Sequence, residues 1–158
     1  MNISVKEMTA DFANQVIKWK YNGEYSVYNH DNSFITEYND GMHFAFVDDE
    51  NKLLGYMCFG LEARVPTDEL NAYDDDYLDI GLHIKPDLNG KGFGNIFLKL
   101  CIEFADSHFN KSNLITTIAK FNKRAQALCK SAGFYESSIV HHKITGKEFV
   151  MFKISISR

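Results

Sequence analysis

Three glycines at alternate positions, Gly90, Gly92 and Gly94, stand between the apolar run Tyr77 to Ile84 and a longer apolar run, Ile96 to Phe109. The first run has the length and composition of a strand, and the second has the spacing of a helix. The first N–H groups of a helix have no partner inside it, and the macrodipole places partial positive charge there. The sequence therefore predicts an α/β chain with an anion site, most often a phosphate site, at this loop.

Two common phosphate loops do not fit this segment. A P-loop needs Gly-Lys followed by Ser or Thr, whereas Lys91 is followed by Gly92. The dinucleotide fingerprint needs G-x-G-x-x-G, and here the third glycine, Gly94, comes one residue early. The next predicted strand, Leu114 to Ile118, also ends without the acidic residue that would bind a ribose.

A third loop fits better. Asn89 to Gly94 resembles the [QR]-x-x-G-x-[GA] pyrophosphate loop of the GNAT superfamily of N-acetyltransferases, with its first residue, Asn89, in the Gln/Arg position. Downstream, Asn122 to Phe134 resembles the family signature N-x-x-A-x-x-L-Y-x-x-x-G-F. Asn122 is also a favourable helix N-cap. The two motifs stand in the family's order, and the resemblance covers Leu78 to Phe134.

Composition narrows the class of protein. The chain has 158 residues, 45% of them hydrophobic and 14% aromatic, which predicts one folded domain over residues 1–158. A net charge of −4 with scattered basic residues argues against a nucleic-acid surface. Three cysteines without CxxC spacing are typical of reduced thiols in the cytoplasm. No apolar run reaches the ~18 residues of a membrane span, and no signal peptide is expected.

The periodicity along the chain predicts alternating strands and helices. A short strand near Ile3 to Val5 precedes a helix capped by Thr9, and Tyr21 to Tyr38 is an aromatic segment read as a short helix plus loop. Strands are expected at 43–47, 53–61, 77–84, 113–119, 134–142 and 148–156, and helices at 92–109 and 124–132. This order matches the GNAT α/β fold, which implies a mixed, mostly antiparallel central sheet flanked by helices.

The resemblance implies a site for acetyl-CoA as co-substrate. In that family the thioester lies beside the strand that precedes the loop, and pyrophosphate lies on the loop. Asn122 would face the pantetheine arm. The residues implied in cofactor binding are Leu82, His83, Ile84, Asn89, Gly90, Lys91, Gly92, Phe93, Gly94 and Asn122.

The proton carriers of the family are less well matched. Cys129 stands where many members have a tyrosine that protonates the leaving thiolate, and a thiol can also donate a proton. Ribosomal-protein alanine acetyltransferases have a glutamate at the position of Thr117, so that subfamily is rejected. Asp79 and His83, which share one face of the predicted strand, are candidate bases. Water-mediated transfer and positioning alone, worth about 7–11 kcal/mol, also remain open.

Acceptor residues have no motif of their own. The aromatic segment lies where the family builds its acceptor pocket, so Tyr25 and Tyr28 are candidates for cation–π contacts with an ammonium group, and Glu24 for an ion pair. The acidic stretch from Asp68 to Asp76 would attract a cationic amine. No metal site is expected, because the neighbouring histidines near position 141 lack ligand spacing.

The sequence therefore predicts a cytoplasmic N-acetyltransferase that moves an acetyl group from acetyl-CoA to a primary amine of a small molecule or to an exposed amino group of a peptide or protein. A non-catalytic acyl-CoA-binding module of the same fold is the alternative. A longer acyl donor and an aminoglycoside-type acceptor also stay open. The hairpin Val140 to Ile156 offers an edge for a homodimer. No nucleic acid or membrane partner is expected.

Overall fold

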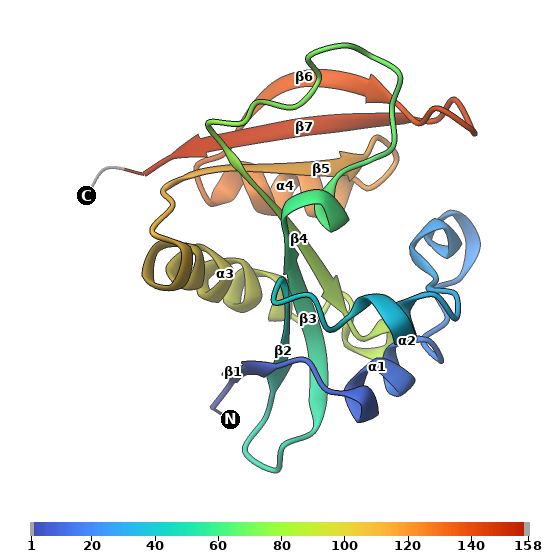
Figure 1. Cartoon of the computed structure of the whole chain (residues 1–158), viewed down its shortest axis with the longest axis vertical. Coiled ribbons are helices and arrows are strands. Elements are labelled where there is room, and N and C mark those ends of the chain that lie inside the picture. The colour runs from blue at the N-terminus through green and yellow to red at the C-terminus, as the bar shows by residue number, and fades with distance from the viewer. Residues whose placement is uncertain (1, 157–158) are drawn as a thin grey trace. The chain divides into compact units, whose positions relative to one another are not determined.

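The computed structural model describes residues 2–156, and within them seven strands form a mixed sheet (Figure 1). The strand order is β1-β2-β3-β4-β5-β7-β6. Strands β4 and β5 are parallel, whereas β1–β2, β2–β3, β5–β7 and β6–β7 are antiparallel. The predicted mixed, mostly antiparallel sheet is confirmed. The strands are β1 (Ser4–Glu7), β2 (His43–Val47), β3 (Leu53–Phe59), β4 (Leu78–Ile84), β5 (Asn113–Ala119), β6 (Tyr135–His141) and β7 (Glu148–Ser155).

Helices connect these strands. The described α-helices are α1 (Ala10–Val16), α2 (Phe34–Glu37), α3 (Phe93–Phe109) and α4 (Lys123–Ser131), and the 3-10 helices are η1 (Gly23–Tyr28), η2 (Gly60–Ala63) and η3 (Pro86–Leu88). Two predicted N-caps are confirmed. The Thr9 hydroxyl accepts a hydrogen bond from the Phe12 amide at 3.1 Å, and the Asn122 side chain accepts one from the Ala125 amide at 3.2 Å.

The described chain divides into two compact units, each built from two stretches of sequence. One unit contains Met1–Cys58 and Leu82–Phe97, and the other contains Phe59–Gly81 and Leu98–Arg158. Strand β4 and helix α3 therefore contribute residues to both. The single domain expected over residues 1–158 stays a prediction.

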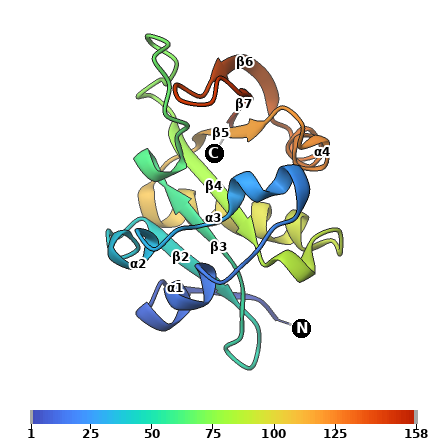
Figure 2. The ribbon, with the colours of Figure 1, turned by 90° about the vertical axis from the view of Figure 1, so that its right-hand side faces the viewer.

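In the first unit, β2 and β3 form a long hairpin with α1 and α2 beside it (Figure 2). Both strands are buried along their whole length. The Phe46 and Phe97 rings stack with centroids 4.3 Å apart. Gly55 permits this close packing, because a Cβ there would lie 2.5 Å from the His83 carbonyl oxygen and 2.8 Å from the Phe97 ring.

In the second unit, β5, β7 and β6 lie side by side and α4 packs on this part of the sheet (Figure 1). Leu114, Ile115 and Phe152 are fully buried there. The Phe59 ring lies 4.9 Å from that of Phe109, centroid to centroid. The strand predicted over 53–61 ends early, at Phe59, because the chain turns into η2 at the next residue, a glycine with φ of +78°.

The buried face of helix α3 differs from the face that its phenylalanines suggest. The sequence pattern favours Phe93, Phe97, Leu100 and Phe104 as the core face. In the structure only the second of these is fully buried, and the buried residues of the helix are Phe97, Leu98, Cys101 and Ala105. The remaining three side chains are half-buried at the flank of the stripe, where large aromatic rings still reach their neighbours.

Candidate functional site

The glycine loop turns through left-handed backbone conformations. Gly90 and Gly92 have φ angles of +76° and +86°, in the left-handed region that favours glycine. A Cβ at Gly92 would meet nothing within 4 Å, so the glycine is required by the backbone conformation and not by crowding. The loop is exposed and leads directly into α3, a helix of 17 residues. It therefore presents accessible amides and a helix N-terminus, which together can hold an anion.

The strand before the loop ends in a fixed position. The Tyr21 hydroxyl donates a hydrogen bond to the Ile84 carbonyl at 2.6 Å, and the Lys85 amide donates one to the Leu54 carbonyl at 2.9 Å. The sequence pointed to Leu82, His83 and Ile84 but gave no reason to include Tyr21. Tyr21 is buried and anchors the segment that also carries the aromatic residues of η1.

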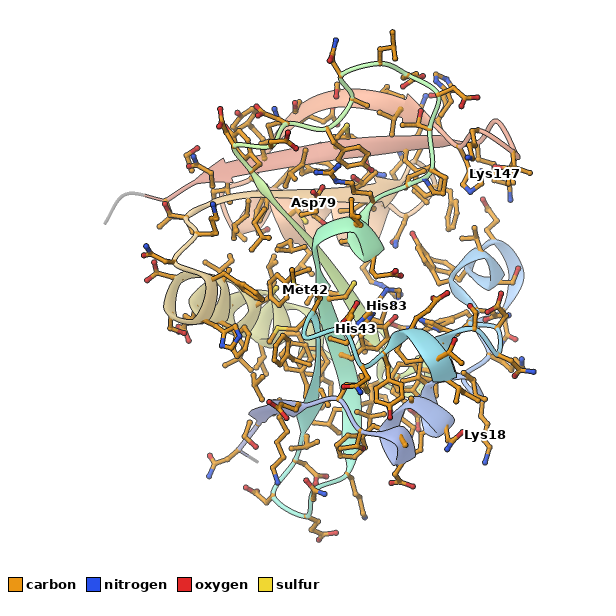
Figure 3. The ribbon with its side chains drawn as sticks, viewed as in Figure 1. Lys18, Met42, His43, Asp79, His83 and Lys147 are labelled. Atoms are coloured by element: carbon orange, nitrogen blue, oxygen red, sulfur yellow. The ribbon has the colours of Figure 1, made fainter. Side chains whose placement is uncertain are left out.

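His83 belongs to a cluster of histidines and aromatic rings in the first unit. Its ring stacks on Tyr56 with centroids 4.5 Å apart and planes 5° apart. His30 approaches the same two rings, with its centroid 5.0 Å from that of His83 and its Nε2 2.6 Å from the Tyr56 hydroxyl. His43 completes the cluster, and Figure 3 labels it together with His83. Neither His30 nor Tyr56 stands in a motif, so only the structure brings them to His83.

Burial keeps His30 and His83 uncharged. It lowers the pKa of His83 well below the ordinary histidine value, with His30 and His43 adding to the effect. Burial also lowers the pKa of His30 to about 4, although Asp31 acts in the opposite direction. The Nδ1 of His43 lies 2.8 Å from a carboxylate oxygen of Asp40. At neutral pH, His30 and His83 are therefore neutral imidazoles, able to accept or donate a hydrogen bond.

Asp79, the other candidate base, lies in the second unit and is engaged in an ion pair. One of its oxygens is 2.8 Å from Nε of Arg64, and the residue is 3% exposed. Burial raises the pKa of Asp79, while the Arg64 guanidinium opposes that rise. The guanidinium also lies over the Tyr73 ring, 4.8 Å from its centroid, and the Tyr73 hydroxyl is 3.2 Å from the Thr117 hydroxyl. A base role for Asp79 would have to compete with this network.

Two site candidates of the second family signature belong to helix α4, Asn122 as its N-cap and Cys129 within it. Asn122 caps the helix with its side-chain oxygen. Cys129 is buried, 4% exposed, and burial raises the pKa of its thiol to about 12. The thiol therefore carries its proton at physiological pH, as a proton donor must.

The acceptor candidates share one short element. Glu24, Tyr25 and Tyr28 all lie on η1, with Glu24 exposed and the two tyrosines half-buried. The rings of Tyr25 and Tyr28 are 6.4 Å apart, centroid to centroid, and Tyr28 is 6.3 Å from Tyr21. The element thus presents a carboxylate beside a group of aromatic rings.

Much of the acidic loop is paired. Glu69 binds His141 Nδ1 at 2.6 Å, and Asp74 lies 3.8 Å from the Lys153 ammonium. The neighbouring Asp75 is fully exposed and lies 3.7 Å from an Arg64 nitrogen. The loop is therefore a less open cation-binding surface than its sequence suggests.

Metal-binding groups and membrane-spanning helices were also expected to be absent. Within residues 2–156, no group of three or more histidine, cysteine or acidic side chains could hold a metal ion. Over the same residues, none of the helices combines the length and apolar character that crossing a membrane requires.

Known proteins resemble the chain in sequence and in fold. Residues 5–135 match the family model described as acetyltransferase (GNAT) domain. A comparison with curated proteins gives no match.

Solved structures resemble nearly the whole chain. A chimera of the spermidine N-acetyltransferase SpeG from Vibrio cholerae and hSSAT has a TM-score of 0.74 at 16% identity, over 98% of this chain and 96% of the chimera. A GNAT-family acetyltransferase from Bacillus anthracis also has a TM-score of 0.74, at 12% identity, over 98% of this chain and 95% of its own. Identities this low show a shared fold alone.

Proposed function

Because the chain belongs to the GNAT acetyltransferase family, we propose that it transfers an acetyl group from acetyl-CoA to a primary amine, either of a small molecule or of an exposed peptide or protein amino group. The observation that carries the proposal is the glycine loop. Gly90 and Gly92 turn the chain through left-handed conformations at the start of α3, where backbone amides favour a pyrophosphate. The exposed ammonium of Lys91 adds positive charge.

The other residues that we assign to acetyl-CoA binding lie in the loop, in the strand before it and at the N-cap of α4. Asn89 to Gly94, including Phe93, would hold the pyrophosphate, and the β4 residues Leu82, His83 and Ile84 would lie along the pantetheine and thioester. Asn122, already the cap of α4, would contact the pantetheine arm. These residues are exposed or half-buried, which fits a binding role.

Acetyl-CoA, when bound, supplies the activated carbonyl. The chain's own residues then handle protons. His83, a neutral imidazole, and Asp79 are the assigned bases, and Cys129 is the assigned acid, because its raised pKa leaves the thiol protonated. A thiol held protonated by burial is a weak acid, so we expect a modest turnover rate.

For the acceptor, Glu24, Tyr25 and Tyr28 are assigned to bind an ammonium group, since η1 presents a carboxylate beside aromatic rings. Spermidine is the first acceptor to test, because it is the substrate named for the SpeG-derived neighbour. We place the reaction in the cytoplasm, which agrees with three buried free cysteines. A homodimer through the edge strand β6 belongs to the same proposal.

The experiment is thermal unfolding with and without acetyl-CoA, with NAD and ATP as controls. A ligand at about 100 times its dissociation constant adds about 2.7 kcal/mol. For a domain of this size that corresponds to about 5–10 °C in Tm. A shift with acetyl-CoA and none with the controls is expected. Equal behaviour with all three ligands would contradict the cofactor assignment.

A non-catalytic acyl-CoA-binding module is the second candidate, and a specific observation favours it. The tyrosine of the second family signature is replaced by Cys129, which is buried, and the glutamate of the ribosomal-protein subfamily is replaced by Thr117. Such a module would show the thermal shift without amine-dependent release of CoA thiol. Thiol release above background with spermidine or another primary amine would exclude it.

A further inference from the structure

His30 carries a buried polar atom without a partner. Among residues 2–156, no hydrogen-bond partner is found for its Nδ1, which is buried. Its other ring nitrogen, Nε2, lies 2.6 Å from the Tyr56 hydroxyl. Buried polar groups in proteins are nearly always satisfied, so an unpaired one at a fixed position points to a ligand.

The geometry around His30 favours one tautomer. If Nε2 carries the proton and donates to the Tyr56 hydroxyl, Nδ1 has a free lone pair. The opposite tautomer would bury an N–H group without an acceptor, which is rarer in proteins than an unsatisfied acceptor. Nδ1 of His30 is therefore a hydrogen-bond acceptor. The ligand that fits it is a donor, as an amino group is.

The surroundings hold the ring in place. The His30 ring packs edge-on against Phe34, His83 and Tyr56, with centroids 5.1, 5.0 and 5.5 Å away. The titratable groups that act on it are Asp31, which is its neighbour in the chain, His43, His83 and Tyr56. Asp31 is the carboxylate among these groups, and the Nδ1 of His43 lies 2.8 Å from an oxygen of Asp40. The ring stays neutral because burial outweighs the effect of Asp31.

We propose that Nδ1 of His30 accepts a hydrogen bond from the acceptor's amino group and takes a proton from that nitrogen during acetyl transfer. The proposal rests on the proposed function. The amine nitrogen forms a bond to the acetyl carbonyl carbon, the carbon–sulfur bond breaks, and CoA leaves as a thiolate that takes up a proton. The proton displaced from nitrogen moves to Nδ1, and the imidazolium then releases it to water. Tyr56 is a positioning residue, since it fixes the tautomer.

His30 fits this role better than either base expected from the sequence. An oxygen of Asp79 is held by Arg64 at 2.8 Å. His83 has one ring face stacked on Tyr56 and stands on the β4 segment assigned to the thioester. His30 lies 5.0 Å from His83, ring to ring, and comes from a different segment, which follows η1 and its acceptor candidates. It therefore lies beside the strand assigned to the thioester and directly after the acceptor candidates in the chain.

Two isosteric substitutions separate a proton acceptor from a structural side chain. In His30→Gln the amide reaches the position of Nε2 and keeps the bond to Tyr56, but nothing replaces Nδ1. In His30→Asn the amide occupies the position of Nδ1 and loses the bond to Tyr56. Each variant is assayed for CoA thiol release with spermidine, or with the best substrate of a primary-amine panel if spermidine is not turned over. Tyr56→Phe, which keeps the ring, serves as a third variant.

We expect His30→Gln to lower kcat/KM by about 100-fold, as general bases commonly contribute. His30→Asn should keep a KM close to that of the wild type and lose kcat, since an amide can bind the amine but cannot take its proton. Tyr56→Phe should lower activity less, because it only frees the tautomer. Near-wild-type kcat/KM in His30→Gln with impaired His30→Asn would overturn the proposal, because it would mean that only the bond to Tyr56 matters.

The thermal shift with acetyl-CoA is measured for every variant. An unchanged shift with lost turnover supports the role of His30, and a lost shift in His30→Gln would contradict it by showing damage to the cofactor site. If the wild-type protein binds no acetyl-CoA, or acetylates no amine, the proposed function fails and the role of His30 fails with it. If the wild type turns over and the variants equal it, only the inference about His30 fails.

Discussion

The guanidinium of Arg64 and the carboxylate of Asp79 form an ion pair in which Nε and Oδ2 are 2.8 Å apart, and Asp79 is almost completely buried. A carboxylate in this position is costly unless it is paired. The pair also holds Arg64 over the Tyr73 ring, so that the start of the acidic loop is fastened to β4. Asp79 therefore has a structural partner whatever it does chemically.

Removing one member of this pair should destabilise the second unit. We expect Arg64→Met to lower the free energy of unfolding by about 2 kcal/mol, below the 3–5 kcal/mol of a fully buried pair because Arg64 is partly exposed. Burial already raises the pKa of Asp79. Without Arg64 the pKa rises further, so stability in the variant falls as the pH rises through that value. Urea unfolding at pH 4 and pH 7 checks this, and the loss should be larger at pH 7.

The double variant Arg64→Met with Asp79→Leu is the matched control. It leaves no buried charge, so it should be closer to the wild type than Arg64→Met and should show no extra loss at pH 7. Equal losses for the single and double variants would show that packing, not charge, is what Arg64 provides.

Acid should weaken the first unit through His30. The folded-state pKa of His30 is lowered to about 4, so the unfolded chain binds more protons between that value and 6.5. The contribution of neutral His30 to the free energy of unfolding is therefore fully present above pH 6.5, the pKa in the unfolded chain. It declines as the pH falls through this window, by up to about 3 kcal/mol. Urea unfolding at pH 7, 6 and 5 should show a shallower decline in His30→Gln. A decline as steep as in the wild type would contradict this.

A negative charge introduced into the glycine loop tests whether the loop binds pyrophosphate. Gly92→Glu should abolish acetyl-CoA binding, because the carboxylate would stand among the amides assigned to pyrophosphate and a side chain there must adopt φ of +86°. Gly41→Glu is the matched control, since Gly41 also has positive φ, +77°, and open space around its Cβ. Isothermal titration with acetyl-CoA should find binding in Gly41→Glu only. Unchanged affinity in a folded Gly92→Glu protein would remove the pyrophosphate assignment.

Gly55 is predicted to be intolerant of any side chain. In Gly55→Ala the new Cβ would lie 2.5 Å from the His83 carbonyl oxygen, which belongs to backbone and cannot rotate away. We expect a loss of about 2–3 kcal/mol in unfolding free energy, typical of overpacking. Gly146→Ala, with φ of +72° and no atom within 4 Å of its Cβ, is the comparison and should lose about 1 kcal/mol. Similar losses in both would mean that the strands shift to accept the methyl group.

Local pattern predicted most of the fold. The caps Thr9 and Asn122 and the alternation of strands and helices are properties of neighbouring residues, and the structure bears them out. The core face of α3 was predicted only in part: Phe97 is fully buried, but the buried Cys101 and Ala105 gave weaker signals than the phenylalanines beside them. Side-chain volume alone does not say which face of a helix is covered.

The candidate site was less predictable, because its residues come from segments far apart in the sequence. His83 was visible from its strand, but His30 lies 53 positions earlier in a segment without periodicity, and only tertiary packing brings their rings to 5.0 Å. The partner of Asp79 was hidden in the same way, since Arg64 precedes an irregular loop. Contacts between segments far apart in sequence leave no mark on one sequence alone. The roles of Cys129 and of the acceptor residues stay predictions.

The interleaving of the two compact units has a consequence for how the protein forms. The chain passes from one unit to the other three times, after Cys58, Gly81 and Phe97, so no single cut releases either unit intact. On a ribosome the first unit is complete only after β4 and the start of α3, to Phe97, have been made, and the second needs the rest of the described chain. Closing such long loops is slow, and folding should be a single late event. A truncated chain should then expose the fully buried β2 and β3 and be removed or aggregate, rather than persist as a half-active fragment.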